Sequence, residues 1–274
     1  MQIRWKLLLL KMKKLLFIPR AIIDILSTWN KPLTIKEKSS LTYTLSILKI
    51  RKWLKKPDDI ISYKLFGYKL KGCNHESLQF LIKEIFIDRI YELDGEFDKA
   101  GHLNIIDIGS NTGLSVLFFK KYFENAVVDA YEPNESSFEI LKQNVKQNKF
   151  SNVHLFNAAI GSKDGVLYPE EGFGPCSVNQ KFSAKGNFNK PIKCLRLINL
   201  IQTGGIDCVK IDIEGNETDV LTDVINNNGL TRVRCWLVEF HNVNEQTNWI
   251  KEQFLKQGFV CRRKKDVYCF KQKE

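Results

Sequence analysis

Short apolar runs alternate with longer stretches of helical hydrophobic spacing along the centre of this 274-residue chain. The short runs have the length of strands, and the longer stretches carry the apolar stripe of an amphipathic helix. Such alternation indicates a parallel sheet with helices on both faces. The predicted elements fall at 103–108, 113–123, 126–131, 135–148 and 153–159.

The alternation resumes beyond residue 200 and ends in a predicted β-hairpin. Between the two halves, residues 162–192 are irregular and rich in Gly, Ser, Asn and Lys. So long an irregular segment inside a domain is usually functional or disordered, and we predict a loop that closes over a substrate. The later elements are a strand at 208–212, a helix at 217–227, a strand at 235–240, a helix at 245–257 and a hairpin of 258–263 and 267–271.

Polar or ionisable residues follow each of the predicted parallel strands, whereas the strand interiors are apolar. In doubly wound sheets, ligands bind beyond the carboxyl ends of the strands. The repetition of this feature therefore predicts a site along one edge of the sheet. The residues at these ends are Asp107, Glu132, Asn157, Asp212 to Glu214, and Glu239 to His241.

The turn after the first of these strands favours a particular cofactor. It contains Gly109 and Gly113 with Asn111 between them, so it lacks the G-x-G-x-x-G pattern that a pyrophosphate requires. Glu132 lies 25 residues beyond Asp107, near the spacing of roughly 20 at which a second-strand carboxylate binds a ribose. A nucleoside without a pyrophosphate fits both features, which favours S-adenosylmethionine over NAD.

Several motifs together resemble a known family. They are D-I-G-S-N-T-G from Asp107, Y-E-P-N from Tyr131, N-A-A-I-G at 157–161, V-K-I-D-I-E-G-N-E at 209–217 and V-E-F-H at 238–241. From about Ser62 to the C-terminus, the chain resembles the FkbM-type S-adenosylmethionine-dependent methyltransferases. The resemblance implies a class I, Rossmann-like doubly wound sheet that is mostly parallel and has an antiparallel last strand. It also implies O-methylation of sugars or other small hydroxylated metabolites, as in polysaccharide biosynthesis.

Each cofactor-binding candidate has a predicted role. The turn should border the methionine end of the cofactor, and Asp107 should stabilise its ammonium group directly or through the turn. Glu132 should accept hydrogen bonds from the ribose diol, and Asn157 should contact the adenine edge. The full set of candidates is Asp107, Gly109, Ser110, Asn111, Gly113, Glu132, Asn157 and Ala158.

Methyl transfer to oxygen is helped by a base that removes the hydroxyl proton, and Asp212, Glu214 and His241 are the catalytic candidates. His241 can act as this base if it keeps its ordinary pKa of about 6.5 and stays largely neutral. Asp212 is an equally good candidate. A third possibility is a divalent metal held by these residues with Glu239. No dense D-x-D-x-D pattern of oxygen ligands appears, so no metal is predicted.

Positive charge is concentrated in the first quarter of the chain. Residues 1–71 hold 17 Lys/Arg and 4 Asp/Glu, whereas residues 72–274 hold 25 and 27, within a total net charge of +11. A basic amphipathic helix at 4–16 is typical of contact with an anionic membrane surface. Its lysines exclude a spanning segment. We predict a basic helical extension over 1–57 and a methyltransferase domain over 58–274, with a hairpin and helix at 58–101 before the core at 102–274.

The seven cysteines include no C-x-x-C pair, which predicts no disulfide and a reducing, cytoplasmic location, with the extension at the inner face of the membrane. Two other functions stay open: a nicotinamide-linked oxidoreductase, and a non-catalytic protein that docks on membranes. A nucleic-acid substrate is disfavoured because residues 72–274 are nearly neutral. The sequence does not identify the acceptor or the oligomeric state.

Overall fold

The computed structural model divides the chain into two compact units, Met1–Lys83 and Glu84–Glu274. The boundary predicted after residue 57 lies inside the first unit. The amphipathic stretch predicted at 4–16 lies outside the residues that the structure describes. Those residues are 28–54, 56, 59–74, 76–93, 97–98, 100–169, 182–183, 191–202 and 204–273.

The first unit contains a helix and a hairpin that pack on each other. Helix α3 (Ile35–Leu54) lies within the basic helical extension that the sequence predicted over 1–57. Strands β1 (Ile60–Leu65) and β2 (Tyr68–Cys73) pair antiparallel. The two residues between them, Phe66 and Gly67, both have positive φ, as a type I′ hairpin turn requires.

Helix α4 (Glu76–Ile82) follows the hairpin and passes into a π-helical turn, η1 (Lys83–Ile87). The sequence predicted one helix after the hairpin within 58–101, and in the structure this helical segment ends at Ile87. No helix in the described part of the chain has both the length and the apolar character needed to cross a bilayer.

Cysteine pairing differs from the prediction in the first unit. Cys73 is disulfide-bonded, so the expectation that the chain forms no disulfide is wrong at this residue. The described cysteines of the second unit are free, and they are Cys194, Cys208, Cys235, Cys261 and Cys269.

The second unit is built on a seven-stranded sheet with the order β12-β13-β11-β10-β3-β4-β5. The five strands from β11 to β5 pair parallel to one another, while β13 pairs antiparallel with both β11 and β12. The prediction of a mostly parallel sheet with an antiparallel last strand is confirmed. The strands are β3 (Asn104–Ile108), β4 (Val127–Tyr131), β5 (Val153–Phe156), β10 (Ile206–Ile211), β11 (Val233–Glu239), β12 (Phe259–Lys264) and β13 (Val267–Gln272).

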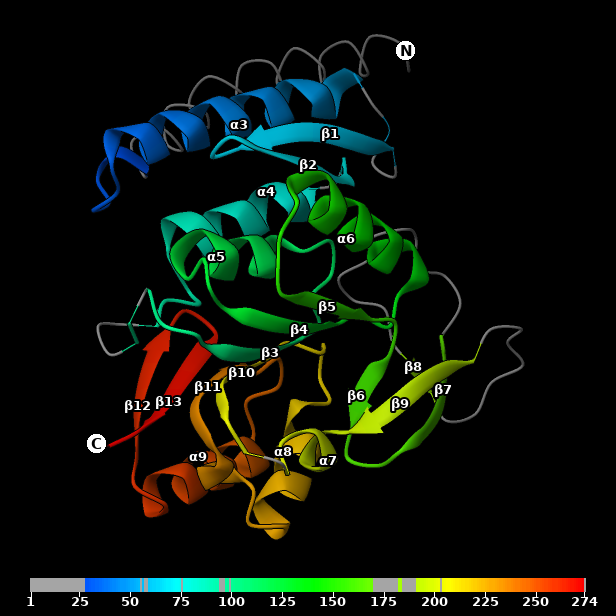
Figure 1. Cartoon of the computed structure of the whole chain (residues 1–274), viewed down its shortest axis with the longest axis vertical. Coiled ribbons are helices and arrows are strands. Elements are labelled where there is room, and N and C mark those ends of the chain that lie inside the picture. Colours follow the sequence, from blue (N-terminus) through cyan, green and yellow to red (C-terminus); the bar gives the residue numbers. More distant parts are fainter. Residues whose placement is uncertain are drawn as a thin grey trace, which may run out of the picture. The chain divides into compact units, whose positions relative to one another are not determined.

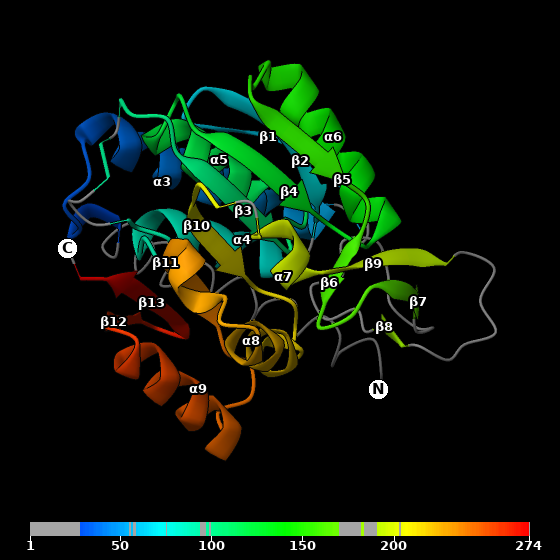
Figure 2. The same ribbon diagram turned by 60° about the horizontal axis from the view of Figure 1, so that its bottom comes forward.

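Helices cover both faces of this sheet, as the alternating pattern predicted (Figure 1; Figure 2). On one face lie α5 (Leu114–Tyr122) and α6 (Glu135–Asn148). On the other lie α7 (Leu197–Leu200), α8 (Glu217–Asn226), the short 3-10 helix η2 (Leu230–Arg232) and α9 (Glu245–Lys256). Buried side chains of α8 and α9 form one hydrophobic core with β10, β11 and β13.

Two helices of the second unit begin at side-chain caps that the sequence supplies. Asn134 accepts a hydrogen bond from the amide of Ser137 and caps α6. Asn244 and Thr247 form a reciprocal capping box at the start of α9. Caps of this kind satisfy amides that have no partner within the helix. They fix the position at which each helix begins after the end of the preceding strand.

A second, four-stranded sheet with the order β6-β9-β7-β8 corrects the prediction for residues 162–192. Part of this segment is regular, because β7 pairs antiparallel with β9. The part expected to close over a substrate falls largely at 170–181 and 184–190, outside the described residues. The strands are β6 (Ala159–Gly161), β7 (Gly165–Pro169), β8 (Phe182–Ser183) and β9 (Ile192–Arg196).

Candidate active site

The turn after β3 packs against the segment that follows β10. Gly109, Asn111 and Gly113 all have positive φ, which glycine adopts without strain and Asn tolerates better than most residues. A Cβ atom at Gly109 would overlap the carbonyl oxygen of Asp212, and one at Gly113 would lie 2.7 Å from Leu141. Glycine is therefore needed at both positions, and its bare backbone brings the turn against Asp212.

Glu132 is tied to this turn by backbone hydrogen bonds. The amide of Asn111 donates to its Oε2 and the amide of Asn134 to its Oε1, each at 2.8 Å. The side chain is buried, and burial raises the pKa of Glu132 to about 7, although these two hydrogen bonds act in the opposite direction. Each carboxylate oxygen has two lone pairs, so both can also accept hydrogen bonds from a ribose diol.

Asn157 and Ala158 have structural contacts in the described chain. The side-chain amide of Asn157 donates to the carbonyl oxygens of Glu132 and Pro133, at 2.9 and 3.2 Å. These hydrogen bonds therefore stabilise the loop after β4. Ala158 is buried in the same hydrophobic core as Tyr131. Their contacts with adenine stay predictions.

Asp107 lies entirely inside the protein. Its side chain has no exposed surface, and its Oδ2 accepts a 2.6 Å hydrogen bond from Ser115. The hydroxyl of Ser110 donates to the backbone carbonyl of Asp107 at 3.0 Å. Of the two predicted modes of action, this burial favours support of the cofactor through the turn over direct contact with the ammonium group.

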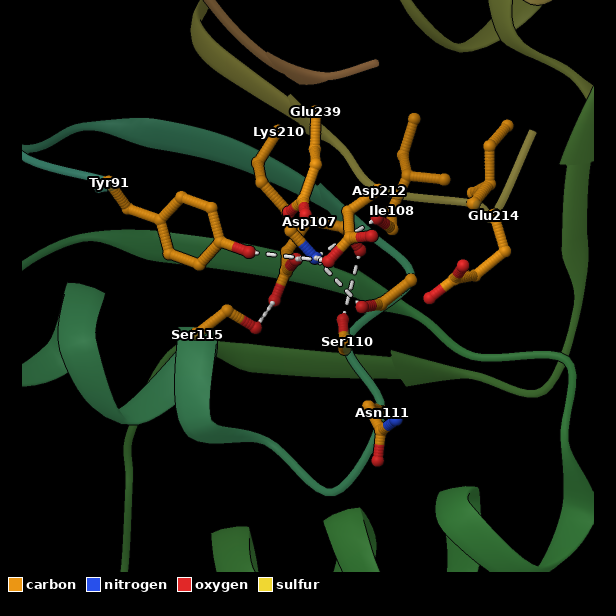
Figure 3. Close-up of polar contacts among 12 residues, drawn as sticks. Tyr91, Asp107, Ile108, Ser110, Asn111, Ser115, Lys210, Asp212, Glu214 and Glu239 are labelled. Atoms are coloured by element: carbon orange, nitrogen blue, oxygen red, sulfur yellow. Dashed lines mark hydrogen bonds and ion pairs between the residues drawn. The ribbon is translucent and has the colours of Figure 1, made fainter. Parts of the chain in front are cut away.

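Lys210 lies between Asp107 and Asp212 and was not among the sequence candidates (Figure 3). Its ammonium nitrogen is 3.2 Å from Asp107 Oδ1 and 3.4 Å from Asp212 Oδ2. It also donates to the carbonyl oxygens of Ile108 and Gly109. Burial acts to lower the pKa of Lys210, but the charges of Asp107 and Asp212 outweigh it and raise that pKa. The ammonium therefore stays charged.

Tyr91 provides a second hydrogen-bond donor to Asp212. Its hydroxyl donates to Asp212 Oδ2 at 3.3 Å (Figure 3). Burial and the nearby carboxylates raise the pKa of Tyr91 well above its ordinary value, so the hydroxyl keeps its proton. The same carboxylate oxygen is thus held by Tyr91 and Lys210.

His241 meets a group of carboxylates that the sequence predicted would converge. Its Nε2 lies 3.3 Å from Glu214 Oε2, and 3.8 Å from both Asp212 Oδ1 and Glu239 Oε1. On the other side of the ring, Nδ1 lies 2.8 Å from Glu217 Oε1. The imidazole is therefore bordered by acidic groups at both nitrogens.

These contacts change the expected protonation of His241. Burial acts to lower its pKa, but the hydrogen bond with Glu217 and the charge of Glu214 outweigh it and raise the pKa of His241 to about 9. The neutral imidazole that the ordinary pKa suggested is therefore wrong for this environment. A protonated imidazole cannot accept a proton, so Asp212 is the better candidate base.

The pKa values of the surrounding carboxylates are raised in some cases and lowered in one. Burial raises the pKa of Glu214 to about 7, and burial together with the charge of Asp212 raises that of Glu239 to about 8. For Glu217, burial is outweighed by hydrogen bonds from His241 and the amide of Gly215, which lower its pKa. Donor atoms of Asp212, Glu214 and His241 lie within 4.8 Å of one another, so the metal alternative keeps a geometric basis.

Three residues of this site were missed in the sequence. Lys210 had a usable signal, because a lysine inside an apolar strand needs a partner when it is buried. Glu217 belongs to the V-K-I-D-I-E-G-N-E motif but lies beyond the strand end, and it reaches the site from the first turn of α8. Tyr91 had no local signal, since it precedes the sheet and meets Asp212 only through the fold.

Comparison with protein families shows which family the chain belongs to. Residues 107–261, more than half of the chain, match the model of the "Methyltransferase FkbM domain". The chain belongs to this family. The match begins at Asp107 and includes the glycine turn, Glu132, the Lys210–Asp212 strand end and His241.

Individual relatives of this FkbM domain are distant. The 31-O-demethyl-FK506 methyltransferase FkbM of Streptomyces tacrolimicus is 26% identical over 65% of this chain and 80% of its own. The hexuronic acid methyltransferase AglP of Haloferax volcanii is 25% identical over 73% of this chain and 84% of its own. Among solved structures, M. jannaschii TYW2 in complex with AdoMet is 16% identical, with a TM-score of 0.44 over 80% of this chain and 89% of that one.

The chain is therefore a methyltransferase, and S-adenosylmethionine is its cofactor. The residues present fit this cofactor, because the buried Glu132 carboxylate lies beside a turn whose glycines leave the backbone bare. The order and directions of the strands are those of the predicted class I methyltransferase fold. Family membership sets aside the two rival functions, a nicotinamide-linked oxidoreductase and a non-catalytic membrane-docking protein.

Proposed function

We propose that this FkbM domain methylates a hydroxyl oxygen of a sugar, a glycan or a similar small hydroxylated metabolite. One observation carries the proposal: the carboxylate of Asp212 stands beside the glycine turn that is predicted to border the cofactor. The amide of Asp212 donates to the carbonyl of Ile108 at 3.2 Å, and Gly109 packs directly on its backbone. A base in this position can act on a hydroxyl that is held in line with the donor.

S-adenosylmethionine supplies an electrophilic methyl group when it is bound. In the proposed reaction the acceptor oxygen forms the new C–O bond as the S–C bond breaks, and Asp212 takes the hydroxyl proton. The products are a methyl ether and S-adenosylhomocysteine. General-base assistance of this kind typically accounts for 10²- to 10⁴-fold in rate.

The other acidic residues and His241 have supporting roles in this proposal. Protonated His241 offers its Nε2–H on the same side as Asp212 Oδ1 and Glu214. It partly balances the charge of the carboxylates and can donate to an oxygen of the acceptor. Glu217 fixes the imidazole by its contact with Nδ1. An acceptor rich in hydroxyls suits a site with so many acceptor oxygens.

Two named relatives support an oxygen acceptor and a sugar substrate class. One acts on a 31-O-demethyl compound, and the other on a hexuronic acid. Because both relatives are distant from this chain in sequence, the acceptor itself has to be identified by experiment.

The test is product mass spectrometry after incubating the protein and labelled S-adenosylmethionine with extracts of the host's surface glycans. We expect one added methyl group on a sugar hydroxyl. Asp212→Asn should lose at least 100-fold in kcat while it still binds the cofactor. Asp219→Asn, an exposed change on α8, is the control. Label that appears only on nitrogen or carbon would overturn the proposal.

We also propose that the first unit brings the enzyme to anionic membranes, where lipid-linked glycans are found. On α3, Tyr43, Ile50 and Leu54 are 63%, 48% and 75% exposed, and their spacing places them on one side of the helix. The helix holds five Lys/Arg and one Glu. Apolar side chains flanked by basic ones favour an anionic bilayer surface.

Sedimentation with vesicles of anionic or zwitterionic lipid tests this second proposal. We expect binding to the anionic vesicles alone, and a several-fold loss in the triple variant Tyr43→Ser, Ile50→Ser, Leu54→Ser. The control is Val243→Ser, which changes an exposed apolar residue of the second unit. Equal binding of the triple variant and the wild type would refute the proposal.

A further inference from the structure

The second unit contains a pocket of about 160 Å³ that is lined by residues of β11, β12 and β13 and of the segment after η1. Its described lining includes neither Glu132, nor Asp212, nor His241. The pocket is therefore distinct from the candidate active site. An apolar cavity of about 150 Å³ is large enough to hold benzene, so this pocket has room for one aromatic ring.

The strand register explains which side chains of the sheet reach this pocket. Arg262 of β12 lies directly opposite Cys269 of β13, and Val260 lies directly opposite Lys271. Lys271 also lies opposite Cys235 of β11. Residues that are directly opposite each other, or two apart on one strand, project from the same face of a sheet. These five residues therefore form one wall of the pocket.

The inner part of the pocket is apolar. The wall that faces the sheet includes Ile90, Leu93 and Phe97, and all three side chains are buried. On the sheet itself, Cys235 and Val267 are buried as well. A reduced Cys behaves as a small hydrophobic residue, so this region favours an apolar group.

The outer part of the pocket is basic. Arg262 is exposed, and Lys264 and Lys271 are partly exposed. The acid of the described lining, Glu92, forms a 2.7 Å ion pair with Lys264. The formal charge of the described lining is +3, from four basic residues and one acid. These residues are Glu92, Arg262, Arg263, Lys264 and Lys271.

We propose that this pocket binds a small aromatic carboxylate. The ring fills the apolar inner part, and the carboxylate lies at the rim beside Arg262 and Lys271. A guanidinium group can bind a carboxylate through two parallel hydrogen bonds. A largely apolar pocket with a few placed polar groups is typical of small-molecule sites. The positive lining disfavours a cation, and the volume disfavours a ligand with a larger apolar body.

The segment after η1 separates this pocket from the candidate base. Ile90 and Glu92 line the pocket, whereas the hydroxyl of Tyr91, between them, donates to Asp212 at 3.3 Å. The ligand and the methyl donor therefore occupy different sites, and this proposal does not rest on the proposed function. Binding of the ligand should persist when S-adenosylmethionine is saturating.

NMR titration of the full chain with benzoate tests the proposal, and benzamide is the uncharged control of similar size. We expect benzoate to cause saturable shifts in the amide signals of Cys235, Val260 and Cys269, both with and without saturating S-adenosylmethionine. Benzamide should bind at least tenfold more weakly, because it lacks the charge that the basic rim attracts. The proposal is overturned by equal affinities, by saturable shifts only elsewhere, by no saturable binding, or by displacement of benzoate by S-adenosylmethionine.

Two variants with matched controls locate the ligand. Cys269→Leu places a larger side chain in the pocket and should weaken benzoate binding at least tenfold. Cys261→Leu changes an exposed cysteine of the same hairpin outside the pocket lining and should leave the affinity unchanged.

Arg262→Gln removes a charge from the rim and should weaken benzoate binding several-fold. Arg232→Gln, at an exposed arginine outside the pocket lining, should not. If Cys269→Leu does not fold, Arg262→Gln decides the question, because Arg262 is exposed. Wild-type affinity for benzoate in Arg262→Gln would overturn the proposal.

Discussion

The backbone amide of Asn111 donates a 2.8 Å hydrogen bond to Oε2 of Glu132, which joins the turn after β3 to the carboxylate after β4. We expect Glu132→Gln to weaken S-adenosylmethionine binding at least tenfold. An amide has only one acceptor oxygen, so it cannot accept from the two backbone amides and from a ribose diol together. Isothermal titration calorimetry measures the change.

The matched control for Glu132→Gln is Glu139→Gln. Glu139 lies on α6, and its side chain is 52% exposed. It should leave the affinity for S-adenosylmethionine unchanged. Equal affinity of Glu132→Gln and the wild type would contradict the ribose assignment.

The pKa of Glu132, raised by burial to about 7, predicts pH-dependent cofactor binding. If the ionised carboxylate is the binding form, a group with this pKa is about 10% ionised at pH 6 and about 90% at pH 8. Affinity should therefore rise roughly tenfold over this range in the wild type, and Glu132→Gln should lack this rise. A flat profile in the wild type would show that the carboxylate does not act as an ionised acceptor.

The same raised pKa of Glu132 makes stability and cofactor affinity change in opposite directions as the pH rises. A raised folded-state pKa contributes stability that is complete below the ordinary value and is lost as the pH rises toward 7. Between pH 5 and pH 7, the ligand-free protein should therefore lose this contribution while its affinity for the cofactor increases.

Alanine variants of Gly109 and Gly205 test whether the turn after β3 packs closely on Asp212. The two glycines have nearly equal φ, 80° and 77°. At either position, alanine should lower the free energy of unfolding by about 1–2 kcal/mol, because the backbone there has a left-handed conformation. At Gly109 the added Cβ also overlaps the carbonyl of Asp212, whereas Gly205 has open space. Gly109→Ala should thus lose much more stability in urea unfolding, together with cofactor binding. Similar losses in the two variants would mean that the turn does not pack on Asp212.

The raised pKa of His241 is directly measurable by NMR titration of its ring. We expect a value of about 9 in the wild type. We expect a decrease of about 1–3 units in Glu217→Gln, which removes a charge in contact with Nδ1. Asp219→Asn, on the same helix but exposed, should leave the value unchanged. A wild-type pKa near 6.5 would restore His241 as a neutral base.

Much of this fold was predictable because each strand and helix has its own local pattern. The parallel strands, their polar ends and the terminal hairpin appear at the expected places. The segment at 162–192 was harder, since the pairing of Gly165–Pro169 with Ile192–Arg196 joins residues far apart in sequence. Strand pairing over such a distance leaves little trace in the local sequence.

Some features of the site could also be predicted from the sequence, and others could not. Glycines with positive φ and acids at strand ends are visible as residue types at fixed spacing. The protonation of His241 was not predictable, because it depends on how many carboxylates the fold brings around one ring. Tyr91 was missed for the same reason, since it reaches Asp212 from 121 residues away in the sequence.

The position of β13 has a consequence for how the sheet forms during synthesis. This strand follows all the others in sequence, yet it lies between β11 and β12 in the sheet. Until it leaves the ribosome, β11 presents an open edge of unpaired backbone groups, and such edges readily pair with other chains. A nascent chain of this protein therefore depends on β13 to become resistant to aggregation, and chaperone binding should be strongest just before β13 appears.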